Sequence, residues 1–148
     1  MTFKFQIKAR FTGAVIFEAD LDDLHESKPD SVKLGEAVRA ALMVNAKLVG
    51  ADLFGVNLEG VNLTCADLRD ANLREANLTC ANLGGADLRG ANMRGADLRD
   101  ANLVDANLGG ADVEGANMRG ANLGGADVEG ANMRGANLEG ANLKGGRS

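Results

Sequence analysis

The residue types that most often carry catalysis are scarce in this chain and stand apart from one another. His25 is the only histidine, and no second ligand or nucleophile lies near it in the polar segment 22–30. Asp and Glu are plentiful but recur at regular intervals, which is typical of solvated carboxylates rather than of an acid–base pair. The chain has no Ser/His/Asp set, phosphate loop or cofactor fingerprint. We therefore predict a protein that is not an enzyme and binds no cofactor or metal ion.

The regular intervals come from a tandem repeat. Twenty consecutive five-residue units run from Ala46 to Gly145, each of the form Ala-(Asp/Asn)-Leu-X-X. The first position is Ala in eighteen units and Val in two, and the third is Leu in fifteen. The fifth position is Gly in fourteen units. The repeat therefore dominates any interpretation of the fold.

A period of five residues excludes both a helix and a straight strand. A helix turns about 100° per residue, so successive units would be offset by about 140° and leave no apolar stripe. In a strand, an odd repeat moves the apolar pair to the opposite face each time. Glycine at the fifth position and Asp or Asn at the second favour turns. The chain must turn a corner every five residues and wind into a solenoid with leucine along its axis.

The units resemble those of the pentapeptide-repeat family, whose motif is A(D/N)LXX, and the match covers residues 46–145 without a gap. The resemblance implies an all-β solenoid, a right-handed quadrilateral β-helix with four units per coil. Twenty units then make about five coils, in a rod roughly 24 Å long. Lys47 departs from the motif, because Asp or Asn is expected there.

Four units per coil place residues twenty apart in one column, so the rod has four sides. We number the sides by the units that begin at residues 46, 51, 56 and 61. The first three sides carry charged residues at their fourth positions, whereas the fourth side is small, flat and nearly uncharged. Its candidate protein-contact residues are Thr64, Gly84, Val104, Gly124, Asn82, Asn102 and Asn122. The alternative is that short side chains accumulated there without selection.

A cluster of arginines is expected across the first two sides, in the second and third coils. It comprises Arg69, Arg74, Arg89 and Arg94, and the flanking acids Asp67, Asp87 and Glu75 are expected to neutralise much of it. The chain has a formal net charge of −5. Direct nucleic-acid binding is therefore not expected.

Cys65 and Cys80 are the only cysteines, and both occupy the fifth position of a unit. Because fifteen residues separate them, they should lie on different sides of the rod. We expect small turn residues that replace glycine, rather than a disulfide or a metal pair.

Residues 1–45 are predicted to form a β-hairpin and a helix that cap the solenoid. Apolar and polar residues alternate over 3–8 and again over 15–21, as in a hairpin with one apolar face. Ser31 can cap a helix that runs to about Val44.

The cap is expected to cover the first coil, because a solenoid end otherwise exposes its core and unpaired backbone. Val49 and Phe54 occupy outward positions of that coil but are apolar, so we expect the cap to cover them as well. The alternative is that residues 1–45 are a binding head carried by the rod.

The C-terminal coil is the predicted place of self-association. Residues 146–148 form a polar tail that is too short to cover it, so its edge and the axial Leu138 and Leu143 are expected to face water. Open β edges pair with other chains, and twofold dimers are the commonest outcome. The sequence predicts a tail-to-tail homodimer, the alternative being a monomer whose tail folds over the end.

The leading functional hypothesis is a non-enzymatic structural or protein-interaction module whose partner the sequence does not name. The alternative is the DNA-mimicking branch of the family, which binds DNA gyrase and protects it from quinolones or inhibits it. Mimicry needs dense negative charge, since duplex DNA carries one charge per about 1.7 Å. A net −5 falls far below that density, and the dimer-forming C-terminal helix of that branch is missing.

No apolar run reaches the length of about 20 residues that a transmembrane helix needs, and the N-terminus lacks the pattern of a signal peptide. A cytoplasmic location is therefore expected, without contact with a membrane.

Overall fold

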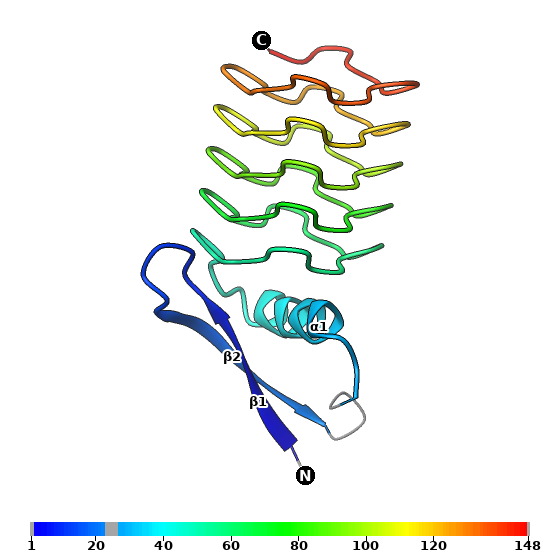
Figure 1. The fold of residues 1–148 in the computed structure, drawn as a ribbon. Helices are drawn as coiled ribbons and strands as arrows, with labels where there is room; N and C mark the ends of the chain where they lie inside the picture. Colours follow the sequence, from blue (N-terminus) through cyan, green and yellow to red (C-terminus); the bar gives the residue numbers. More distant parts are fainter. Residues whose placement is uncertain (1, 23–26, 148) are drawn as a thin grey trace.

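The computed structural model describes residues 2–22 and 27–147 as a hairpin, a helix and a stack of coils (Figure 1). β1 (Thr2–Lys8) pairs antiparallel with β2 (Val15–Asp22), and α1 (Asp30–Met43) follows. The predicted hairpin and helix are thus present. Among the described residues 2–22 and 27–147, no helix is long and apolar enough to span a membrane. His25 lies outside the described residues.

The hairpin buries one face because its apolar residues alternate. Ile7 is fully buried, and Ala19 and Leu21 are almost so. The register is regular from Thr2↔Asp22 to Ile7↔Phe17 and shifts before Lys8, which pairs with Val15. Beyond this shift the hairpin reaches the first coil, where Ala9 bridges Ala51.

Helix α1 begins two residues earlier than expected, and Ser31 is not its cap. Pro29 occupies the N-cap position and makes no capping bond, because its side chain has no polar atom. The carbonyl of Ser31 instead accepts the backbone N–H of Asn57 at 3.1 Å. The buried side of α1 includes Val38 and Ala41, two of the residues expected there.

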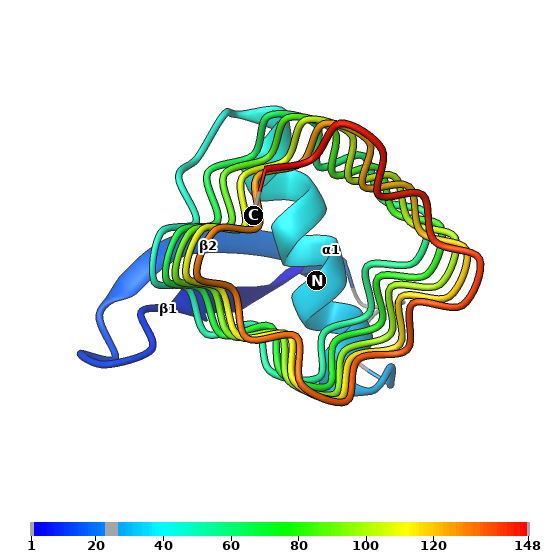
Figure 2. The same ribbon diagram turned by 90° about the horizontal axis from the view of Figure 1, so that it is seen from above.

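The coils stack by parallel bridges between residues twenty positions apart, from Asp52↔Asn72 to Asp127↔Arg147. Units inside the stack make the same bonds. In one example, Leu88 donates its N–H to Asn107 O at 2.7 Å, and Asn107 donates back to Ala86 O at 2.9 Å. A coil therefore contains four units, and seen along the stack the coils superpose with α1 across one end (Figure 2).

Every unit ends in a left-handed corner. All twenty fifth positions, from Gly50 to Gly145, have positive φ, including the six that are not glycine. Glycine takes this conformation without steric cost, whereas an L-residue loses about 1–2 kcal/mol. The corners predicted from the period are thus confirmed.

The first and third positions of each unit form a continuous aliphatic core. Leucines such as Leu68 and Leu88 are fully buried, and so are Met93 and Met118. The alanines between them are also buried through Ala126, because a narrow coil has no room for larger residues there.

The expectation that the cap covers Val49 and Phe54 is wrong. Val49 is 36% exposed and Phe54 is 50% exposed. The helix and hairpin lie beneath the end of the stack, not along its sides, so outward residues of the first coil stay in contact with solvent (Figure 1). The guanidinium carbon of Arg74 instead lies over the ring of Phe54, 5.9 Å from the centroid of the ring.

Replacement of a core leucine by aspartate should unfold the stack. Leu88→Asp buries an unpaired carboxylate in an aliphatic column, and we expect a loss of about 4 kcal/mol or more. Arg89→Ala changes the next, solvent-facing residue and should leave the melting temperature almost unchanged. Thermal melts compare the two variants, and equal melting temperatures would contradict the buried column.

Gly35 should be essential for the close contact between α1 and the first coil. A Cβ at this position would overlap the carbonyl oxygen of Asn57. Gly35→Ala adds about 1 kcal/mol of helix propensity, yet we expect a net destabilisation of about 1–3 kcal/mol from the overlap. Urea denaturation measures it, with Glu36→Ala as the control in the same helix. A more stable Gly35→Ala protein would show that α1 can shift without cost.

Candidate functional site

The fourth side carries an asparagine column along the whole rod. Each asparagine Oδ1 accepts the backbone N–H two residues further on, at 3.2 Å for Gly84 and 3.2 Å for Val104. Two further bonds join neighbouring coils, from Asn102 Nδ2 to Asn82 Oδ1 at 2.9 Å and from Asn142 Nδ2 to Asn122 Oδ1 at 2.8 Å. Much of the amide hydrogen-bonding capacity is therefore used within the side itself.

The fourth side is flat at the fourth positions that are glycine, because glycine has no side chain. A Cβ on Gly84 would lie 3.3 Å from Asn82 Oδ1 and 3.4 Å from Asn102 Nδ2, so it would press on that amide pair. Gly124 stands in the same relation to Asn122 and Asn142. Gly84, Val104 and Gly124 are half-buried, whereas Thr64 is exposed. The structure thus brings the predicted contact residues into one column, and their role as a contact stays a prediction.

The predicted basic cluster is largely neutralised. Arg69 Nε and Nη2 donate to the two carboxylate oxygens of Asp67, both at 2.8 Å. Arg89 makes the same fork to Asp87, at 2.8 and 2.6 Å. A bidentate pair of this kind is directional and stronger than a single bond.

The other two arginines of the cluster behave differently from each other. Arg94 Nη1 lies 3.0 Å from Glu114 and 3.5 Å from Asp112, both on the next coil. Within the described residues Arg74 has no ion pair, so Glu75 does not neutralise it as expected, and its guanidinium lies over the ring of Phe54.

The arginine forks alter the protonation of their partners. The hydrogen bond from Arg69 lowers the pKa of the Asp67 carboxyl, and those from Arg89 and Arg99 do the same for Asp87 and Asp97. These carboxylates therefore stay ionised to lower pH than free aspartate. Their role is electrostatic, since a paired carboxylate is poorly suited to accept a proton.

The described residues offer little to a metal ion or a nucleophile. No three His, Cys, Asp or Glu side chains gather as metal ligands among residues 2–22 and 27–147. Cys65 and Cys80 are free, exposed thiols at corners on different sides, with φ of 56° each. Both are the turn residues that the sequence predicted.

The last coil is more open than those below it. Leu143 is 49% exposed, whereas Leu138 is only partly exposed and packs against the core. Self-association through these residues stays a prediction.

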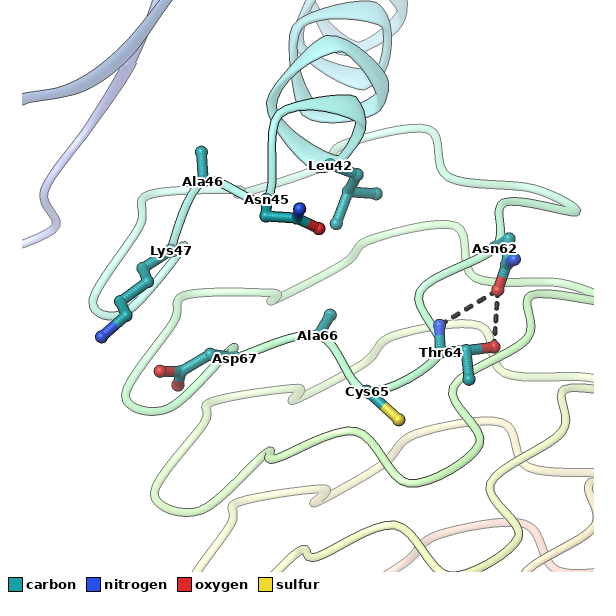
Figure 3. A pocket seen from close by; sticks show the side chains of 9 residues that line it. All are labelled: Leu42, Asn45, Ala46, Lys47, Asn62, Thr64, Cys65, Ala66 and Asp67. Atoms are coloured by element: carbon teal, nitrogen blue, oxygen red, sulfur yellow. Dashed lines mark hydrogen bonds between the residues drawn. The ribbon is translucent and has the colours of Figure 1, made fainter.

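One feature was missed by the sequence reasoning. A hollow of about 400 Å³ lies where the chain passes from α1 into the first coil (Figure 3). Its walls include Leu42 from α1, Asn45 and Lys47 where the repeat begins, and Asn62 and Cys65 from the end of the first coil. The sequence signal that could have pointed to this hollow was Lys47, which stands where the motif expects Asp or Asn.

In a comparison with protein-family models, the model described as pentapeptide repeats (8 copies) matches this chain at residues 41–79, 51–90, 81–120 and 114–147. Comparison with curated protein sequences gave no match.

Several solved structures are similar to this chain. A pentapeptide repeat protein from the cyanobacterium Cyanothece 51142 is 32% identical, over 74% of this chain and 91% of that chain, with a TM-score of 0.39. One from the Arabidopsis thaliana thylakoid lumen is 33% identical, over 68% and 63% of the two chains, with a TM-score of 0.41. A form of QnrB1, a plasmid-mediated fluoroquinolone resistance protein, is 25% identical over 69% and 57%, with a TM-score of 0.30.

Loss of the bidentate Asp67–Arg69 pair should lower the stability of the fold only at pH values at which Asp67 is ionised. Because its folded-state pKa is lowered, Asp67 stabilises the fold fully above the ordinary pKa of about 4, and this contribution is lost as the pH falls through the folded value. We expect Asp67→Asn to lower the melting temperature by about 2 °C or less at pH 7, since both partners are partly solvated. The difference should vanish in melts near the acid limit of stability.

Asp127→Asn is the matched control, because Asp127 lies on the same side at the same position and its carboxylate has no ion pair with an arginine among the described residues. A pH-independent effect of Asp67→Asn would mean that the fork contributes through packing rather than charge.

Proposed function

Because the chain belongs to the pentapeptide-repeat family, we propose that its right-handed quadrilateral rod is a non-enzymatic module for protein interaction, with the fourth side as the contact. The observation that carries the proposal is the asparagine column with its flat neighbours Gly84, Val104 and Gly124. At the second and fourth positions of this side, Lys144 in the last coil is the only charged residue. A partner protein can therefore cover several coils without stripping water from a carboxylate or guanidinium.

The asparagine amides favour a protein partner over a small ligand. Two bonds along the column, from Asn102 to Asn82 and from Asn142 to Asn122, hold part of the repeated array, and amide groups without such a bond can serve a partner's backbone or side chains. A flat array of this kind suits an extended surface rather than a pocket. We propose that the interaction takes place in the cytoplasm.

The alternative is a DNA mimic that binds DNA gyrase. The aspartates at 67, 87 and 97 are each neutralised by an arginine, which lowers the density of negative charge that mimicry requires. The alternative therefore ranks second.

A comparison of two valine variants tests the proposed contact. Val104 and Val49 both occupy fourth positions, on the fourth and first sides. We expect Val104→Glu to reduce retention of partner proteins from a native cytoplasmic extract at least about tenfold, because it places an unpaired charge in the interface. Val49→Glu should retain the same proteins as the original chain.

Equal retention by the two variants would remove the fourth side as the contact. A DNA supercoiling assay with gyrase runs beside the pull-down, and inhibition or quinolone protection at stoichiometric protein would replace the proposal with the alternative.

A further inference from the structure

The cap pairs the second-position backbone N–H groups on the lower edge of the first coil on only two of the four sides. On the second side, Asp52 N–H donates to Lys8 O at 2.7 Å. On the third side, Asn57 N–H donates to the Ser31 carbonyl at 3.1 Å. On the fourth side, the N–H of Asn62 has no partner among the described residues.

The corresponding groups one coil higher show what the fourth side lacks. Asn82 N–H donates to Val61 O at 2.9 Å, and its carbonyl accepts from Leu63 at 2.7 Å. Gly84 O accepts from Cys65 at 2.9 Å. In the first coil the equivalent donor and acceptors, Asn62 N–H, Asn62 O and Thr64 O, make no backbone bond within the described residues. These three groups have the spacing to pair with one more parallel strand.

There is room for such a strand beside α1. The hollow at the start of the coil meets a second hollow, also of about 400 Å³, at Leu42 and Asn62. We call the two together the end groove. Figure 3 shows the first hollow, with Leu42 and Asn45 on the wall nearer α1 and Asn62 on the opposite wall. The end groove thus follows the open edge of the first coil.

The lining of the end groove indicates what would occupy it. Met43 is 87% exposed beside it. Arg39, whose Nη1 lies 3.9 Å from Glu36 in a long ion pair, lines one hollow, and Lys47 lines the other. The one carboxylate in the lining, Asp67, is held by the fork of Arg69. The groove is therefore apolar in the middle and positive toward its ends.

The same coil already accepts an extended segment on another side. Ala9 pairs with Ala51 as an antiparallel bridge, and Arg10 N–H donates to Gly50 O at 2.7 Å. The edge of the first coil can thus receive a strand that approaches from below, and the end groove continues this edge.

From the open edge, the space and the charge, we propose that the end groove binds an extended acidic segment of a partner protein as an added β-strand. The segment's backbone pairs with Asn62 and Thr64, its apolar residues contact Leu42 and Met43, and its carboxylates face Arg39 and Lys47. This mode of recognition draws affinity from main-chain bonds and specificity from alternate side chains. It rests on the proposed role as an interaction module but uses the lower edge of the first coil, where the asparagine column begins at Asn62, rather than the outward face of the column.

The two cysteines provide a direct assay, because Cys65 lines the end groove and Cys80 does not. The probe is a synthetic peptide, acetyl-Glu-Val-Thr-Ile-Glu-amide, and the readout is the rate of iodoacetamide alkylation of each cysteine by mass spectrometry. We expect the peptide to slow alkylation of Cys65 several-fold and to leave Cys80 unchanged. The same peptide with N-methylated amides at alternate residues, which cannot pair, should have no effect.

Charge-reversal variants test whether the protection of Cys65 by the peptide depends on Lys47. Lys47→Glu should abolish protection of Cys65, whereas Lys144→Glu, the same change on the fourth side of the last coil, should preserve it. Val104→Glu should also preserve it, which separates this proposal from the contact surface proposed above. Absence of protection at millimolar peptide, equal protection of both cysteines, or protection by the N-methylated peptide would overturn the inference.

Discussion

The structure depends on a single backbone constraint, the left-handed corner at every fifth residue. Each corner lets the chain turn so that first and third positions point inward again in the next unit. Because the corners recur at equal spacing, residues twenty apart come into register and their backbone groups pair from coil to coil. The six corners without glycine show that this pairing outweighs a cost of about 1–2 kcal/mol at each.

The same constraint limits where function can reside. First and third positions are committed to the core, and at most second positions the Asp or Asn oxygen accepts a backbone N–H two residues on. The fourth position remains free to vary, so any specificity must be arranged in columns along a side. On the first side the fourth position supplies arginines that neutralise aspartates, whereas on the fourth side it supplies glycine and valine.

The junction between the cap and the first coil breaks the repeat, and irregular features concentrate there. Gly35 is needed because α1 approaches the backbone at Asn57 too closely for a side chain. The hairpin and helix pair the second-position N–H groups of the first coil on two sides only, since each can follow the edge for a short distance. A helical stack must begin with a step, and the hollow beside Leu42 and Asn62 lies at that step.

The sequence by itself determined the period, the inward residues and the corners, because these follow from the local geometry of five residues repeated twenty times. The columns were expected only through the resemblance to the pentapeptide-repeat family, which implies four units per coil. The hairpin and helix were also predictable from their periodicity. Only the tertiary structure decided that Arg94 pairs with Asp112 and Glu114, which lie eighteen and twenty residues away on the next coil. It also decided that Val49 and Phe54 stay exposed and that Asn62 faces an open groove. These features depend on how the cap sits against the first coil, and no repeated pattern in the chain encodes that contact.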